Sequence, residues 1–320
     1  MSRAKQSKAI LDLTPEWFAA RRLGITSTDV VAILGLSRYK SEGDVARDKL
    51  GTVPDDFIAD DASARRMRIG TAVQDVVRAE EEIEHGVKLR RVRRLVTSAL
   101  HPWAITSLDY ERVGERTIVE VKSSSSREWD DGLPERVEAQ VRWQMGVADY
   151  PRAHVAALRY GNQLACFDVE HDETIWANLL LVAENFRERL AAGGPFDETK
   201  QSARRAWPFS DGTTLPADDD LIEAVRDLLQ VREAVKAYED REDKLVAAIT
   251  TKMGPAEELV GVPGVRVTWR RAADSTQTEW KLIAEGLLAK LTDDEREALV
   301  SIQTSTRPGS RRFIVKETQR

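Results

Sequence analysis

Two hydrophobic periodicities alternate along the first 196 residues, and this alternation restricts the possible folds more than any other feature. Helical spacing occurs at 15–22, 27–35, 64–86, 134–148 and 172–192, and strand-like alternation occurs at 87–98, 103–113, 116–122, 152–161 and 163–170. Ser27 or Thr28 is predicted to cap the second helix. The pattern predicts an α/β domain in which helices flank a mixed central sheet.

The character of the sequence changes after this part of the chain. Residues 200–217 mix charged residues with Pro and Gly, as interdomain linkers do. A long charged helix is expected at 221–252, a small β-unit at 262–271 and another helix near 279–291. We therefore predict an N-terminal domain over 1–199, a linker over 200–217 and a mainly helical extension with a β-unit over 218–320.

Composition excludes several classes of protein. With 42% hydrophobic and 32% charged residues, the chain has a globular composition, and no apolar run approaches the roughly 18 residues that span a bilayer. The N-terminal residues lack the apolar segment of a signal peptide, so we expect a cytoplasmic protein without membrane contact. Cys166 is the single cysteine, which excludes disulfide scaffolds and four-cysteine clusters, and it is expected to pack as a small apolar side chain.

Charge is distributed unevenly along the chain. The formal net charge is −6, yet five of the seven residues at 88–94, KLRRVRR, are basic. Such a run is either a solvated face or a surface that binds phosphates. An acidic protein binds DNA when its basic residues line one groove, so nucleic acid stays open as a partner.

The strand at 116–122, RTIVEVK, carries two charges among its valines. Side chains alternate along a strand, so Glu120 and Lys122 share one face while Val121 points to the other. Across the predicted turn at Gly114, Asp109 converges on Glu120. Two carboxylates and the Val121 carbonyl are suitable oxygen ligands for Mg²⁺, and Lys122 is then placed to orient or deprotonate a bound water. The alternative is an exposed edge strand with a weak ion pair.

Several motifs occur in order around this strand. They are EWFAARRLGITSTDVVAILGLSRYKS, RIGTAVQ, LHPWAITSLDY, IVEVKSS and LPERVEAQVRWQMGV. This series resembles the YqaJ viral recombinase family, which includes phage lambda exonuclease and belongs to the PD-(D/E)XK nuclease superfamily. The resemblance covers roughly residues 14–195, and it implies a restriction-endonuclease-like core.

The resemblance assigns roles to individual residues. It implies that Asp109 and Glu120 bind metal, that Lys122 is the catalytic lysine and that Gln140 is the helix glutamine of the site. It also implies Arg21 and Thr28 at a DNA 5′-phosphate and Gln74 at an uncertain position, which either binds a second metal or supports a metal ligand. Gln144 follows Gln140 at i+4, so both glutamines share a helical face and are expected to reach the substrate backbone or the catalytic water. The family normally carries a glutamate where this chain has Gln74, so a second metal is in question.

The resemblance also implies an activity. The expected protein is a Mg²⁺-dependent exonuclease, with Mn²⁺ as a substitute, that digests linear duplex DNA from 5′ to 3′ and exposes single strands for phage-type recombination. Its implied partners are double-stranded DNA ends, a single-strand annealing protein and further copies in a ring trimer, in the cytoplasm of a bacterial host. From the residues alone, an endonuclease of the same fold and a catalytically weakened DNA-binding assembly protein remain alternatives.

Overall fold

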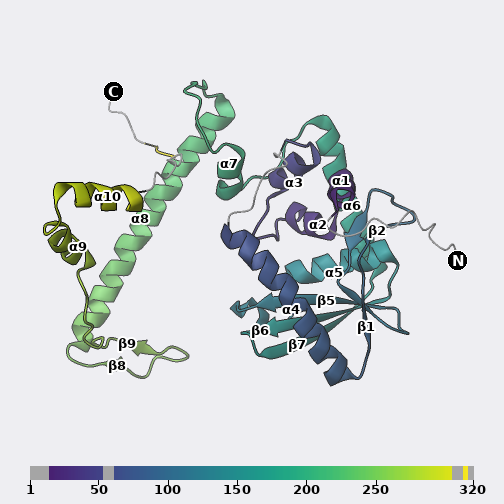
Figure 1. Ribbon diagram of the computed structural model, residues 1–320, viewed down its shortest axis with the longest axis horizontal. Coiled ribbons are helices and arrows are strands. Elements are labelled where there is room, and N and C mark those ends of the chain that lie inside the picture. Colours follow the sequence, from purple (N-terminus) through teal and green to yellow (C-terminus); the bar gives the residue numbers. More distant parts are fainter. Residues whose placement is uncertain (1–13, 53–60, 305–312, 316–320) are drawn as a thin grey trace. The chain divides into compact units, whose positions relative to one another are not determined.

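The computed structural model describes residues 14–52, 61–304 and 313–315, which form two compact units (Figure 1). The first unit comprises Met1–Pro208 and the second Phe209–Arg320. No helix among the described residues is long and apolar enough to cross a bilayer. The candidate site lies in the first unit.

A five-stranded mixed sheet forms the centre of the first unit. Its strands follow the order β1 (Leu89–Arg91), β4 (Tyr110–Arg112), β5 (Thr117–Ser124), β6 (Arg152–Arg159) and β7 (Gln163–Glu170). β5 and β6 are parallel and are connected through α5 (Glu135–Ala148), whereas the other neighbours are antiparallel. A parallel pair requires such a crossover. The predicted mixed sheet with flanking helices is confirmed.

The two faces of the sheet are covered by different helices. On one face, Ile118 and Val155 pack with Val137 and Val141 of α5. On the other face, Val119, Val121 and Ala156 pack with Val77 of α4 (Asp61–His85), which crosses the strands in Figure 1. Because side chains alternate along β5, Glu120 and Lys122 belong to the α5 face.

α2 (Ser27–Ile33) and α6 (Glu173–Ala192) pack against α5. α3 (Glu42–Lys49) packs against α2, and α1 (Pro15–Leu23) packs against α3. The apolar core here includes Val30, Val45, Trp143 and Phe186. The predicted cap of α2 was wrong: Thr26 is the N-cap, because its hydroxyl accepts the Asp29 N–H while the Asp29 carboxylate accepts the Thr26 N–H.

The segment that was predicted as one strand at 103–113 is divided. β3 (Ile105–Ser107) pairs with β2 (Leu95–Thr97) in a separate two-stranded sheet, and β4 joins the main sheet. Asp109 lies at a bend between the two strands. Because Asp109 lies at a bend, its side chain is not restricted to one face by the alternation of side chains along a strand. The hairpin between β4 and β5 forms as predicted.

The predicted linker at 200–217 contains a helix, α7 (Lys200–Ala206), which belongs to the first unit. Ser202 is fully buried, and Arg205 pairs with Asp44 of α3. A polar composition does not reveal these contacts. A short 3₁₀ helix, η1 (Arg127–Trp129), completes this unit.

The second unit is mainly helical, as predicted. It contains α8 (Asp219–Met253), β8 (Glu258–Leu259), β9 (Val267–Thr268), α9 (Trp280–Leu288) and α10 (Asp293–Gln303). β8 and β9 pair antiparallel. α10 was not predicted, although Thr292 begins it with a capping box to Glu295.

Candidate active site

Asp109 is held by groups from two elements. Its Oδ2 accepts a hydrogen bond from the Val121 N–H at 2.9 Å, and its Oδ1 accepts one from Gln74 Nε2 of α4 at 2.9 Å. Burial, followed by the nearby Glu120 carboxylate, raises the pKa of Asp109 to about 7. The uncharged donors around Asp109 leave its negative charge incompletely compensated.

Glu120 and Lys122 point toward α5. Glu120 is only 4% exposed, and its Oε1 accepts hydrogen bonds from Lys122 Nζ at 2.5 Å and from Gln140 Nε2 at 2.7 Å. Lys122 Nζ also donates to Gln140 Oε1 at 2.9 Å. The structure therefore brings Glu120, Lys122 and Gln140 together around one carboxylate.

Gln144 lies one helical turn after Gln140 and also contacts Glu120. Its Nε2 donates to Glu120 Oε2 at 2.8 Å and to the Ser107 carbonyl at 3.2 Å. The side chain is only 1% exposed, so the expectation that Gln144 faces DNA was wrong. A buried amide beside a buried carboxylate instead positions that carboxylate.

Gln74 connects the site to the basic run at 88–94. Its Oε1 accepts from Arg91 at 3.1 Å while its Nε2 donates to Asp109. The Arg91 guanidinium also lies 5.9 Å from the centre of the Tyr110 ring. Arg91 was not singled out as an individual site residue, although the basic run contained it.

Arg21 and Thr28 lie on α1 and α2 and contact each other. Arg21 donates to the Thr28 hydroxyl at 3.4 Å, and its guanidinium lies 4.5 Å from the centre of the Trp17 ring. Thr28 is exposed, whereas the capping residue Thr26 is buried. The role of this pair at a DNA end stays a prediction.

The arrangement favours a bound cation. Asp109 accepts from the N–H of Val121, the residue that follows Glu120, and after burial the repulsion from the Glu120 carboxylate contributes to the raised pKa of Asp109. A hard divalent cation relieves this repulsion and accepts oxygen ligands. The Val121 N–H donates to Asp109, and the Val121 carbonyl as a metal ligand stays a prediction.

A mixed sheet with an acidic bend, a Glu-x-Lys strand and a following glutamine helix is the arrangement expected of a PD-(D/E)XK core. Residues 16–151 match the sequence profile of the YqaJ-like viral recombinase domain. The resemblance to this family that the motifs predicted is therefore confirmed over this part of the chain.

The chain is also similar to individual proteins. The chain is 32% identical over 178 residues to the uncharacterized protein YqaJ of Bacillus subtilis (strain 168), covering 54% of each chain, so it spans about half of that relative's length. Among solved structures, the alkaline exonuclease LHK-Exo of Laribacter hongkongensis matches with 20% identity and a TM-score of 0.47, over 56% of this chain and 94% of that one. A phage-related exonuclease of Haemophilus somnus 129PT matches with 12% identity and a TM-score of 0.41, over 53% and 96%.

Proposed function

We propose that this protein is a Mg²⁺-dependent deoxyribonuclease that digests linear duplex DNA from its ends, in the 5′ to 3′ direction, to expose single strands for recombination. The observation that carries the proposal is the buried Glu120 carboxylate held between Lys122 and Gln140, with Asp109 beside it. A purely structural ion pair does not require a second, half-buried carboxylate with a raised pKa. The family match supports the class of substrate.

The chain's own residues divide the work in this proposal. Asp109 and Glu120 would hold the metal, with the Val121 carbonyl as a third ligand. The chemistry that Mg²⁺, or Mn²⁺ in its place, would supply there is a lower pKa for the attacking water and compensation of charge on the phosphodiester. Lys122 uses two N–H groups on Glu120 and Gln140, which leaves a third N–H to orient the attacking water or the phosphate oxygen.

A basic cavity beside Tyr110 suits the DNA backbone. Its volume is about 300 Å³, and it is lined by Asp75, Arg78, Leu89, Arg91, Arg93 and Tyr110. Three arginines provide charged donors for phosphate oxygens. Since Arg91 also contacts Gln74, the cavity is connected to Asp109 through a single side chain.

Substitution of Glu120 tests the catalytic part of the proposal. Glu120→Gln preserves the shape of the side chain but removes the metal-binding charge, so Mg²⁺-dependent cleavage should fall at least about 100-fold. Circular dichroism should show an unchanged fold. Glu128→Gln is the matched control, because Glu128 pairs with Arg38 and Arg136 outside the site. Near-normal turnover by Glu120→Gln would refute the assignment.

The choice of DNA substrate tests the mode of cleavage. Linear, nicked and covalently closed DNA are incubated with and without Mg²⁺, and linear duplexes carry a label at the 5′ or the 3′ end. Digestion of linear DNA alone, with early release of the 5′ label, is expected. Cleavage of closed circles identifies an endonuclease instead, and binding without cleavage identifies an assembly protein.

Two further parts of the proposal concern partners. A single-strand annealing protein is the expected recipient of the exposed strand, and a ring-shaped homotrimer is the expected assembly. Both rest on the family resemblance, and sedimentation of the full chain with and without duplex DNA measures the second. A monomer under both conditions would contradict it.

A further inference from the structure

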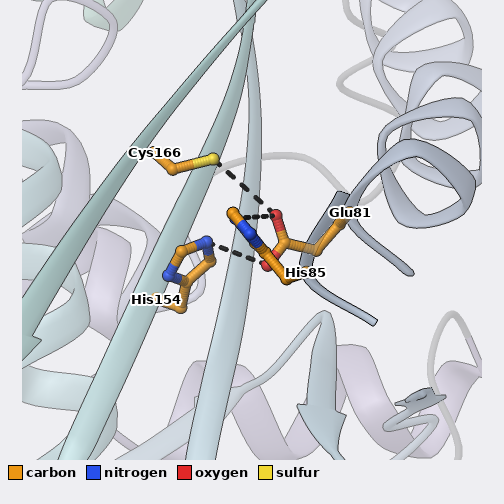
Figure 2. Close-up of side chains that lie close together, drawn as sticks. All are labelled: Glu81, His85, His154 and Cys166. Atoms are coloured by element: carbon orange, nitrogen blue, oxygen red, sulfur yellow. Dashed lines mark hydrogen bonds and ion pairs between the residues drawn. The ribbon is translucent and has the colours of Figure 1, made fainter. Parts of the chain in front are cut away.

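A second group of potential metal ligands lies on the α4 face of the sheet, outside the candidate active site (Figure 2). Glu81 and His85 are one turn apart on α4, while His154 lies on β6 and Cys166 on β7. Each residue offers one ligand atom, and these four atoms all lie within 4.8 Å of one another. Three separate elements therefore converge on one point.

The distances resemble those of a tetrahedral metal site. Glu81 Oε2 lies 3.4 Å from His85 Nε2 and 3.7 Å from Cys166 Sγ. Tetrahedral zinc with bonds of about 2.0–2.3 Å separates its ligand atoms by roughly 3.3–3.8 Å. Oε2 and its neighbours already have this spacing, and the most distant pair must approach by about one ångström.

His154 is oriented toward the same point. His154 and Asp168 lie opposite each other in the β6–β7 register, and His154 Nδ1 is 2.7 Å from the Asp168 carboxylate. Its Nε2 is buried and makes no hydrogen bond of normal geometry with any described residue, although Glu81 Oε1 lies 2.9 Å away. A carboxylate on Nδ1 that leaves Nε2 directed inward is the usual arrangement of a metal-binding histidine.

Glu81 uses its two oxygens differently. Oε1 faces Arg112, at 2.9 Å, and His154, whereas Oε2 faces His85 and Cys166. Arg112 thus orients the carboxylate from outside and leaves Oε2 for a metal. Glu81 is fully buried, and a buried carboxylate needs strong compensation for its negative charge.

A metal-free ion-pair network is the competing interpretation. Burial acts to lower the pKa of His154, but its contacts with Cys166, Glu81 and Asp168 outweigh this effect and raise that pKa to about 10. In this interpretation His154 and Glu81 form an ion pair, whereas a metal requires the neutral imidazole as its ligand. The two states differ in metal content, which is directly measurable.

We propose that Glu81, His85, His154 and Cys166 form a structural zinc site that fastens α4 to β6 and β7. One thiolate and two imidazoles select a borderline-soft cation such as Zn²⁺, in contrast to the oxygen ligands of the candidate active site. Gln74 lies two turns before Glu81 on the same helix, about 10 Å along its axis. The metal therefore also fixes the helix that supports Asp109.

The test measures zinc in the full-length protein. The double variant Asp109→Asn, Glu120→Gln serves as the background, so that the active-site carboxylates cannot bind the added metal. At pH 8, after loading with ZnSO₄ and desalting, elemental analysis should find about one Zn²⁺ per chain. Loading with Co²⁺ instead should give a tetrahedral visible spectrum with a thiolate charge-transfer band.

His85 and Cys166 are not fully buried, so variants at these two positions are expected to fold. His85→Ala and Cys166→Ser should each weaken Zn²⁺ binding at least 10-fold, and Cys166→Ser should abolish the thiolate band; Asp168→Asn should weaken binding about 10- to 100-fold. His171→Ala is the matched control, because His171 Nε2 also lies 3.4 Å from a glutamate, Glu173, outside the cluster. Zinc content far below one per chain in the background protein, or unchanged binding in His85→Ala and Cys166→Ser, would overturn the site in favour of the ion-pair network.

Discussion

Replacement of Gln74 by glutamate gives a quantitative test of the charge balance at the candidate active site. Gln74 Nε2 donates to Asp109 Oδ1 at 2.9 Å, and a carboxylate oxygen in the same place would face another carboxylate instead. Two unit charges about 3 Å apart repel by roughly 5 kcal/mol at an effective dielectric constant of 20. The lost hydrogen bond adds about 1 kcal/mol.

Relaxation reduces this penalty. The new side chain turns toward Arg91, which lies 3.1 Å from Gln74 Oε1 and gains a charged partner. We expect a net loss of about 1–3 kcal/mol in the metal-free protein at pH 8, where Asp109 is mostly ionised. For a unit of this size, the melting temperature should fall by roughly 2–4 °C per kcal/mol.

A divalent cation should reverse the sign of the effect. With a third carboxylate near Asp109, Mn²⁺ or Mg²⁺ binds more tightly and stabilises the variant more than the wild type. The assay is thermal melting in EDTA and in MnCl₂ for wild type, Gln74→Glu and the uncharged control Gln74→Met, which loses the hydrogen bond without adding charge. A Gln74→Glu melting temperature at or above wild type in EDTA, or a deficit that Mn²⁺ leaves unchanged, would refute the reasoning.

Three other perturbations have defined outcomes. Arg21→Ala should reduce the preference for 5′-phosphorylated over 5′-hydroxyl duplex ends, measured as a ratio of digestion rates, and an unchanged ratio would exclude that role. Gly146→Ala should lower the melting temperature despite an intrinsic helix gain of about 1 kcal/mol, because the new Cβ would lie 2.2 Å from Trp176 ring atoms; a higher melting temperature would contradict this. Burial acts to raise the pKa of Asp29, but Lys49 at 2.7 Å and other groups hold it below 3.8, so the stabilisation is present above about pH 4 and is lost as the pH falls below it. Between pH 5 and pH 2, the melting temperature should therefore fall more for wild type than for Asp29→Asn. An equal fall in both proteins would exclude a stabilising Asp29–Lys49 pair.

Local patterns predicted the elements that carry the site, but not every position within them. The β4–β5 hairpin, the helix with Gln140 and the convergence of Asp109 with Glu120 follow from periodicity and a turn at Gly114. The bend at Asp109 did not, because alternation along a segment contains no information about which sheet each half joins. The burial of Gln144 was also missed, since it depends on the position of Glu120 across the helix–sheet interface.

The cluster on the opposite face shows the same limit more strongly. Cys166 was expected to pack as an apolar side chain, and its strand position alone supports that interpretation. Glu81 and His85 have helical spacing, but His154 and Cys166 join them only through the β6–β7 register and the path of α4. No spacing rule connects residues that far apart in sequence. Such a site becomes visible only when the elements are assembled.

The two carboxylates of the candidate active site differ in how their charges are compensated, and this difference explains the charges on strand β5. Glu120 accepts from the cationic Lys122 and from two glutamine amides, so its burial is supported by the chain itself. Within the described part of the chain, Asp109 accepts from the neutral Gln74 amide and the Val121 N–H, and its pKa is raised. The charge of this half-buried carboxylate is therefore less well compensated than that of Glu120, and Gln74 connects it to the basic cavity. A chain that needed β5 only for its sheet would gain stability from an apolar residue in place of Glu120; the retained charge is consistent with a site that binds a cation and a phosphate.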